Sequence, residues 1–337
     1  MLHNTLRIEV LHAESDLSFL NQYQYEQSYY RQLTSDSSIR IAFTKHKIER
    51  RLVQSKEANT VFCIRDDNHV YLLFGVDYNE LHSSVFNHRI IEVGPFYYLN
   101  HSKYEGVVEV LQAFFKKHES EVHTFYKCKI DNSDSMSIRL LQECGFSYVT
   151  SALKMMYNPE KSRNVFNAYY NTKVSSFHDD YEVQVIDYSD HKESIHSLIK
   201  QHRKSVHYYM YEKDFSQSMI ESLFEQWFVH FAHKSNTTIL GLFHKTTNSL
   251  KGFTSFNGPM LIGSTPIYSR DVTIIHRDYL GKGLALLLYK KMNEITNACI
   301  EGNPLSDNYR NVQFNQHCGY SIVQSRCYMT RFGESHK

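Results

Sequence analysis

One eight-residue pattern occurs twice in this sequence of 337 residues, once near the middle and once near the end. The segment from Cys144 to Ser151, CGFSYVTS, matches the segment from Cys318 to Ser325, CGYSIVQS, in its cysteine, its glycine, its valine and both serines. Each copy follows a short run with helical spacing and leads into a strand with alternating apolar residues. A repeat on the scale of half a chain indicates two copies of one fold, so the sequence predicts two similar domains.

Length and charge are compatible with this organisation. A chain of 337 residues favours two domains, each large enough for its own hydrophobic core. The formal net charge is +1, so we expect neither nucleic acid nor a membrane as a partner. The start, Met1 to Asn4, lacks the basic-then-apolar design of a secretion signal, and no apolar run approaches the ~18 residues of a membrane span. We therefore expect a cytoplasmic protein, with assembly of identical copies left open.

Cysteine and histidine give no sign of a metal site. The 20 histidines form no H-E-x-x-H cluster, and the six cysteines show no C-x-x-C spacing. We expect no metal, and reduced, mostly buried thiols at Cys63, Cys128, Cys144, Cys299, Cys318 and Cys327.

Strand and helix patterns alternate in both halves, which predicts an α/β (α+β) protein with a mixed, mostly antiparallel sheet flanked by helices in each domain. In the first half we expect strands at 6–11, 60–66, 69–78, 89–99 and 121–129 and helices at 19–33, 104–118 and 135–143. In the second half we expect strands at 182–186, 237–244, 250–257, 266–276, 298–301 and 320–331 and helices at 191–202, 216–232, 281–295 and 308–317.

The domain boundaries follow from a polar stretch at 158–180. This stretch contains Asn158-Pro159 and shows no sustained period, so we interpret it as a linker, with a single helix around Val165 to Tyr170 as the alternative. The first domain then spans residues 1–157 and the second spans residues 181–337.

A glycine-rich turn distinguishes the second half. The strand beginning at Asp271 is followed by Gly281-Lys282-Gly283-Leu284-Ala285 and at once by a helix. Glycines allow a sharp turn, and the start of a helix presents unpaired amides and the positive end of the helix dipole. This order of elements indicates phosphate or pyrophosphate binding, although glycine turns at helix starts also occur in proteins that bind nothing.

This turn resembles the acyl-CoA loop of the GCN5-related N-acetyltransferase (GNAT) superfamily, written Q/R-x-x-G-x-G/A. Gly283 and Ala285 match its last two fixed positions, whereas Leu280 replaces the usual Gln or Arg. Asn308, which precedes Gly319, is similar to the asparagine of the family's N…GF ending. The resemblance extends over residues 182–331 and implies coenzyme A as cosubstrate, with these contacts: Thr273, Ile274 and Ile275 on the splayed strand, Gly281, Lys282, Gly283, Leu284 and Ala285 in the loop, and Asn308 on pantetheine.

The first half shares the order of elements and lacks the loop. Its equivalent helix opens at Lys103-Tyr104-Glu105-Gly106, and Asp134 replaces the asparagine. A carboxylate near a phosphate repels it. We expect a degenerate copy without coenzyme A, retained for structure or for holding the acceptor.

A two-part chain with an active second GNAT domain resembles the bacterial nucleotide-sugar N-acyltransferases that act on dTDP-linked amino sugars. The resemblance implies direct acyl transfer from acyl-CoA to the sugar amine, for synthesis of a surface polysaccharide. The tyrosine-rich segment before the 216–232 helix offers rings and hydroxyls to such an acceptor. The expected acceptor-binding residues are Tyr208, Tyr209 and Tyr211 in this segment and Trp227 on the helix. Alternatively, these side chains do not bind an acceptor and only cap a helix and pack between the two domains.

Catalysis requires an uncharged amine and a leaving thiolate. We expect backbone amides of the strand at Ile275 to stabilise the oxyanion. The family often places an acidic tyrosine seven residues after the asparagine, and this position is Asn315, which cannot protonate a thiolate. Either another group protonates the leaving thiolate, or coenzyme A leaves as the thiolate. Asp271 and His276, which flank the strand, are candidate bases through a water, or else structural caps.

Two other functions remain open from the sequence. The losses at Leu280 and Asn315 are compatible with a coenzyme A sensor that does not turn over. An acyltransferase for aminoacyl or protein amines is the other alternative, although a net charge of +1 does not indicate a tRNA-binding face.

Overall fold

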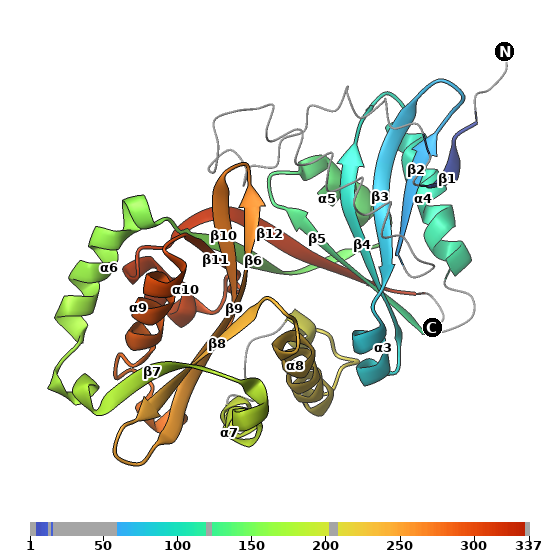
Figure 1. The fold of residues 1–337 in the computed structure, drawn as a ribbon. Helices are drawn as coiled ribbons and strands as arrows, with labels where there is room; N and C mark the ends of the chain where they lie inside the picture. Colours follow the sequence, from blue (N-terminus) through green and yellow to red (C-terminus); the bar gives the residue numbers. More distant parts are fainter. Residues whose placement is uncertain (1–4, 13–14, 16–58, 119–122, 202–207, 334–337) are drawn as a thin grey trace. The chain divides into compact units, whose positions relative to one another are not determined.

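The computed structural model describes residues 5–12, 15, 59–118, 123–201 and 208–333, and the helix expected at 19–33 lies outside them (Figure 1). The chain forms two compact units. Unit 1 contains Met1–Ser151 together with Ser325–Lys337, and unit 2 contains Ala152–Gln324.

Unit 1 is a mixed sheet with strand order β1-β2-β3-β4-β5-β12. Its strands are antiparallel except for β4 and β5, which run parallel. The helix α4 buries an apolar stripe, Val107, Val108, Leu111 and Phe115, which packs in the main core of the unit. The elements are β1 (Arg7–Leu11), β2 (Asn59–Arg65), β3 (Val70–Tyr78), α3 (Glu80–Phe86), β4 (Arg89–Tyr98), α4 (Tyr104–His118), β5 (Thr124–Asp131), α5 (Ser135–Glu143) and the start of β6 (Ser147–Tyr157).

Unit 2 repeats this plan with strand order β6-β11-β10-β9-β8-β7, in which only β10 and β11 are parallel. Alternate residues of β8 face two different cores: Leu240 and Leu242 pack with α9, and Ile239 and Phe243 pack with α7 and α8. The elements are α6 (Pro159–Lys173), η2 (Ser176–Asp180), β7 (Tyr181–Ile186), α7 (Tyr188–Gln201), η3 (Tyr208–Tyr211), α8 (Gln217–Ala232), β8 (Thr237–His244), β9 (Ser249–Ile262), β10 (Thr265–Ile275), η4 (Arg277–Tyr279), α9 (Ala285–Thr296), β11 (Cys299–Gly302), α10 (Tyr309–His317) and β12 (Ser321–Phe332).

The strands that follow the two repeated segments are exchanged between the halves of the sequence. The end of β6, from the first half, pairs with β11 in unit 2 through Met155, Met156 and Tyr157. The end of β12, from the second half, pairs with β5 in unit 1 (Figure 1). The compact units therefore divide at residues 151/152 and 324/325 instead of at the expected boundaries. Alternation along a strand reveals which face is buried and leaves its sheet neighbour unspecified, so the sequence pattern does not predict this exchange.

The segment expected as a linker, 158–180, instead holds α6 and η2. The side chain of Asn158 accepts a hydrogen bond from the Glu160 amide, and Pro159 occupies the first turn of α6, where its missing N–H costs nothing. Phe166 on α6 is buried in the core of unit 2. The polar composition of the segment reflects a helix with one narrow buried face.

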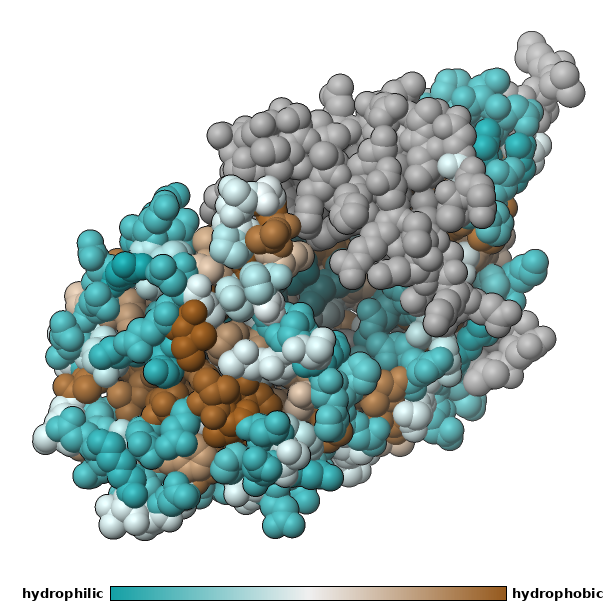
Figure 2. Space-filling model, viewed as in Figure 1, coloured by the Kyte–Doolittle hydropathy of each residue, from teal (hydrophilic) through white to brown (hydrophobic). Residues whose placement is uncertain are grey.

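All six cysteines are buried with free thiols, as expected. No helix in the described part of the chain is long and apolar enough to cross a membrane. The described surface seen in Figure 2 is largely hydrophilic, with smaller hydrophobic areas.

Candidate functional site

The loop that joins β10 to α9 has the geometry of an anion cradle. Gly281 and Gly283 both have a φ of +78°, a left-handed conformation that side chains disfavour, so α9 begins at Ala285 and not at residue 281. A Cβ added at Gly281 meets nothing within 4 Å, so the turn is open on that side. Within the described chain, the amides of Gly283, Leu284 and Ala285 have no carbonyl partner. Three donors at the positive end of a helix suit a phosphate.

A buried histidine from η2 fixes the shape of this loop. The His178 Nε2 lies 3.0 Å from the carbonyl oxygen of Lys282, and its Nδ1 accepts a bond from the Ser175 amide. Because a carbonyl only accepts, the Nε2 of His178 donates this hydrogen bond. A Cβ on Gly283 would lie 3.2 Å from Nε2, so glycine is needed for this close packing. The sequence did not single out His178, because its segment was expected to be a linker.

Positive charge lies beside the cradle. The Lys282 ammonium is 4.9 Å from the ring centre of Tyr279 and 5.9 Å from that of Phe177, both within the range of cation–π attraction. Leu280, at the position where the family pattern has Gln or Arg, is exposed. Lys282 is thus the cation that this loop itself supplies.

The strands β10 and β11 part next to this loop. Their parallel pairing covers Ile267 to Ser269 and ends there, while β10 continues to Ile275 alongside β9. A bulge in β10 at Asp271 accompanies the separation, as the register with β9 shifts between Arg270 and Val272. Parted strands leave main-chain groups along their facing edges for other partners. Thr273, Ile274 and Ile275 lie on this part of β10, where a splayed strand was expected.

Asp271 and His276 have different surroundings. Asp271 is an exposed residue whose carboxylate accepts a 2.9 Å hydrogen bond from the Asn257 side chain. Partial loss of water around the carboxylate, opposed by Lys234 and Asn257, raises its pKa to about 7. His276 caps η4 by accepting a bond from the Asp278 amide. The two residues are five positions apart along an extended strand, a distance of about 16 Å. The two side chains therefore cannot serve one amine together.

Asn308 and Asn315 hold α10 in place. Asn308 caps α10 by accepting the Asn311 amide, and its side-chain NH₂ group has no partner among the described residues. Asn315 is fully engaged, because its Nδ2 donates to Asn311 and its Oδ1 accepts bonds from the Arg270 Nη2 (2.8 Å) and the Tyr289 hydroxyl (3.1 Å). The usual tyrosine position is thus occupied by the anchor of a buried arginine, a residue that the sequence did not single out.

The expected acceptor residues fall into different environments. Tyr209 is fully buried and packs edge-on against Phe215, so its ring offers no free stacking face. Tyr211 is 48% exposed. Trp227 packs among the aromatic side chains of α8 in the core against β8. The side chain of Tyr208 lies outside the described part of the structure.

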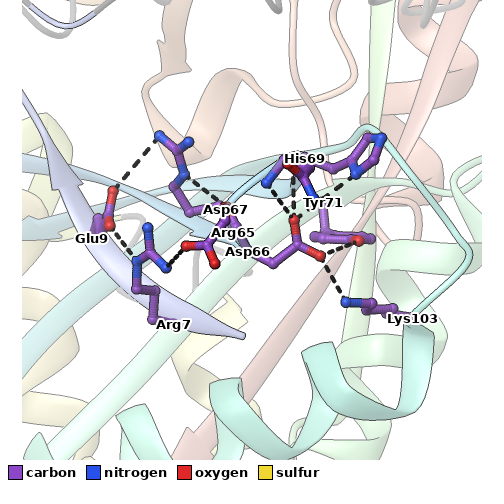
Figure 3. Close-up of polar contacts among 9 residues, drawn as sticks. Arg7, Glu9, Arg65, Asp66, Asp67, His69, Tyr71 and Lys103 are labelled. Atoms are coloured by element: carbon purple, nitrogen blue, oxygen red, sulfur yellow. Dashed lines mark hydrogen bonds and ion pairs between the residues drawn. The ribbon is translucent and has the colours of Figure 1, made fainter. Parts of the chain in front are cut away.

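The corresponding helix start in unit 1 is occupied by an internal ion pair (Figure 3). The Lys103 ammonium, just before α4, lies 2.6 Å from Oδ2 of Asp66, and the Tyr71 hydroxyl donates to the same oxygen. The amides of Asn68 and His69 donate to Oδ1, and together with Lys103 they hold the pKa of Asp66 well below its usual range. A buried carboxylate thus already neutralises the lysine that precedes this helix.

Within the described residues, no cluster of three or more histidine, cysteine, aspartate or glutamate side chains has the arrangement of a metal site.

No protein-family model matches the sequence, and no curated protein sequence matches it either. Solved structures do match. A tandem GNAT protein from the clavulanic acid biosynthesis pathway superposes with a TM-score of 0.58 and 11% identity, over 98% of this chain and 100% of that chain. A GCN5-related N-acetyltransferase from Sphaerobacter thermophilus gives 0.59 and 8% identity, over 97% and 95% of the two chains.

A third solved structure contains a GCN5-related glucosamine N-acetyltransferase region, which belongs to a fungal multi-domain GH3 β-N-acetylglucosaminidase. It gives a TM-score of 0.59 and 10% identity, over 97% of this chain and 38% of that chain. At these identities the likeness concerns the fold. The expected architecture, two GNAT-like α/β domains in tandem, is confirmed.

Proposed function

We propose that this chain is an acyl-CoA-dependent N-acyltransferase whose coenzyme A site lies in unit 2. The observation that carries the proposal is the Gly281–Gly283 turn, with unpartnered amides at the start of α9, which follows the part of β10 that continues beyond its pairing with β11. The loop and Lys282 would hold the pyrophosphate, and the parted edge of β10 and the free NH₂ group of Asn308 would pair with the amides of pantetheine.

In this reaction the chain's own groups move a proton and stabilise charge. The acceptor amine attacks the thioester carbonyl, and main-chain amides at the β10 bulge stabilise the oxyanion. Asp271, with a pKa of about 7, accepts the amine proton directly or through a water at neutral pH. The N–C bond forms as the C–S bond breaks, and coenzyme A leaves as the thiolate, since Asn315 has no proton to give.

The acceptor that we propose is the amine of a nucleotide-linked, dTDP-type amino sugar used in bacterial surface polysaccharide synthesis. Tyr211, half-exposed just before α8, supports this proposal because its ring offers a stacking face and its hydroxyl a partner for sugar oxygens. The ion pair of Asp66 with Lys103 supports a structural role for unit 1 in place of a second coenzyme A site.

Binding of coenzyme A to the purified protein tests the site. Gly281→Asp places a carboxylate in the open turn, and we expect it to weaken coenzyme A binding at least about 100-fold because like charges repel in a site built for phosphate. Gly263→Asp is the matched control, because Gly263 also has a positive φ but lies at the β9–β10 turn, at the other end of β10. Equal binding by the two variants and the wild type would remove the loop from the proposal.

Release of free thiol from acetyl-CoA and from other acyl-CoA thioesters, with a panel of dTDP-linked amino sugars, aminoacyl-tRNA and peptide amines, then identifies the acceptor. Thiol release with the sugars alone supports the proposal. Release with aminoacyl or peptide amines would mean that one of these amines, and not an amino sugar, is the acceptor. Tight binding of coenzyme A without release for any acceptor indicates a sensor.

A further inference from the structure

A buried arginine in unit 2 forms no ion pair with a carboxylate among the residues that the structure describes. Arg270 is 7% exposed, and its guanidinium lies against two neighbouring rings, 4.5 Å from the centre of Tyr289 and 4.9 Å from that of Tyr320. Its Nη2 donates to Asn315, a neutral group. The nearest acidic group in sequence, Asp271, attracts Arg270 electrostatically but makes no direct ion pair with it, and its carboxylate accepts a bond from Asn257.

Two hydrogen-bond donors of this cluster are unused. The Nη1 of Arg270 and the hydroxyl of Tyr320 are both closed to solvent, and neither has a hydrogen-bond partner in the described structure. Buried polar groups are nearly always paired, and a buried cation without a counter-ion is among the most costly groups to place in an interior. The cluster therefore calls for a ligand that is negatively charged and accepts two hydrogen bonds.

The fold itself does not require this cluster, as the first copy of the repeat shows. The parallel pairing of β4 with β5 and of β10 with β11 aligns Val93 with Arg270. The repeated segments align Leu141 with Asn315 and Phe146 with Tyr320. All three positions are apolar and buried in the core of unit 1. The same fold is therefore stable with an ordinary apolar core at this place.

A fourth difference makes room for the arginine. Gly302 at the end of β11 aligns with Cys128 of β5, and a Cβ on Gly302 would lie only 2.6 Å from the Arg270 Nη2. Glycine at this position lets the guanidinium lie against the backbone of β11, where the two parallel strands part. Four features of this cluster therefore occur together, and of the two units only unit 2, which carries the glycine loop, has them. They are Arg270, the Asn315 side chain that anchors it, the Tyr320 hydroxyl and Gly302.

We propose that Arg270 and Tyr320 bind the carboxylate of a dicarboxylic acyl group, so that the acyl donor is a malonyl- or succinyl-type CoA thioester in place of acetyl-CoA. This inference rests on the proposed function, because that function brings the thioester to the gap between β10 and β11. A carboxylate fits the planar guanidinium and accepts from two donors at once. The methyl group of acetyl accepts none, and a thiolate is a single weak acceptor.

The chemistry of transfer is unchanged by this assignment. The amine nitrogen bonds to the thioester carbon, the C–S electron pair leaves with sulfur, and the amine proton passes to Asp271. The distal carboxylate keeps its charge throughout and ends on the amide product. Arg270 and Tyr320 are thus specificity residues, and the product carries a new negative charge.

Binding constants for matched thioesters test the inference. Succinyl-CoA is compared with butyryl-CoA and malonyl-CoA with propionyl-CoA, because each pair differs only by a carboxylate in place of a methyl group. For the wild type we expect at least one dicarboxylic thioester to bind about 10- to 100-fold more tightly than its neutral counterpart, as for a hydrogen bond to a charged group. Equal affinities within both pairs would overturn the inference and would leave the two donors with a buried water at most.

Each variant replaces a residue of unit 2 by the residue at the aligned position of unit 1. The triple change Arg270→Val, Asn315→Leu and Tyr320→Phe recreates the core of unit 1, and we expect it to remove or reverse the preference. Tyr320→Phe alone removes one donor without changing the shape, and we expect the preference to fall about 3- to 10-fold. If the triple variant fails to fold, the single variant decides. A preference that is intact in Tyr320→Phe would contradict the role of its hydroxyl and with it the proposed pair.

Tyr157→Phe is the control, since it removes a hydroxyl from another buried tyrosine of the same core and we expect it to leave the preference unchanged. Coenzyme A without an acyl group separates the two proposals. If it does not bind at all, the proposed function and this inference both fail. If coenzyme A and acetyl-CoA bind as tightly as both dicarboxylic thioesters, only this inference fails.

Discussion

The carboxyl group of Asp271 has a pKa near neutrality because the surrounding protein displaces water from it, while Asn257 offsets only part of that effect. As a base it must be ionised, so we predict that the transfer rate rises with pH up to about 7 and then levels off. Asp271→Asn keeps the side-chain shape and removes the base. We expect a rate about 100-fold lower and no rise near pH 7, measured by thiol release from pH 5 to 9. An unchanged profile would assign the base to another group.

The raised pKa of Asp271 also affects the stability of the folded protein, and this effect is favourable at low pH, where the base is inactive. Because the folded pKa of Asp271 lies above its value of 3.8 in the unfolded chain, the folded state binds the proton more tightly. Its contribution to the free energy of unfolding is therefore most favourable below about pH 4 and is lost as the pH rises to about 7. We predict that Asp271→Asn is more stable than the wild type at pH 8 and loses this advantage at pH 4, by urea denaturation. A constant difference between the two proteins would contradict the shifted pKa.

His178 acts on the loop from outside it, through its hydrogen bond to the Lys282 carbonyl. We predict that His178→Ala weakens coenzyme A binding about 3- to 10-fold, the worth of one net hydrogen bond, because the loop amides lose their fixed orientation. His178→Gln restores a side-chain N–H donor and should recover part of the affinity. A loss of thermal stability in both variants with unchanged affinity would show that the histidine only supports the core.

At this scale the sequence predicted some residues and missed others, for a physical reason. Gly281 and Gly283 were predictable, because the conformation of a turn depends on the residues within it. His178 and Arg270 were missed, because their roles arise from contacts with distant residues, Lys282 in one case and Asn315 in the other. A charged residue inside a strand that the sequence predicts, as Arg270 is, is the signal that would have indicated a buried polar site.

Among the elements, α4 and α9 begin in related places and differ in the groups beside the helix start. A glycine turn with Lys282 precedes α9, whereas Lys103 before α4 is paired with the buried Asp66. We predict that Asp66→Ala lowers the free energy of unfolding of unit 1 by about 2 kcal/mol, because several hydrogen bonds to a charged group are lost. Coenzyme A affinity should not change, since the cradle lies in unit 2. Denaturation and binding measurements on one preparation check both parts.

The pH dependence of this contribution also has a definite sign. The folded pKa of Asp66 lies below its unfolded value, so its stabilisation is present above about pH 4 and is lost as the pH falls further. The difference between wild type and Asp66→Ala should therefore shrink in acid. A difference that persists at pH 2 would mean that the carboxylate contributes through packing alone.

For the whole molecule, the repeat predicted two related folds correctly and left the partners of their last strands unspecified. A strand's alternation defines its buried face, and Met329 and Cys327 of β12 are indeed buried, but in the core of unit 1. The sequence boundaries at residues 157 and 181 follow chain order, whereas the compact units follow hydrogen bonding. Chain order and sheet order differ here because edge strands pair wherever an open edge is available.

This exchange makes the stability of unit 1 depend on the end of the chain. A chain that stops after Gln324 loses the residues of β12 that pair with β5, along with Cys327 and Met329 of the unit 1 core. We predict that the amides of β5 then exchange with solvent at least about 100-fold faster, because an unpaired strand beside an opened core unfolds locally. A chain that stops after Gly333 keeps β12 and is the control. Mass-spectrometric hydrogen exchange resolves the peptide that covers residues 124–131. Protection that is equal in the two truncated chains would show that β5 does not depend on β12, and that unit 1 is completed by the first half of the sequence alone.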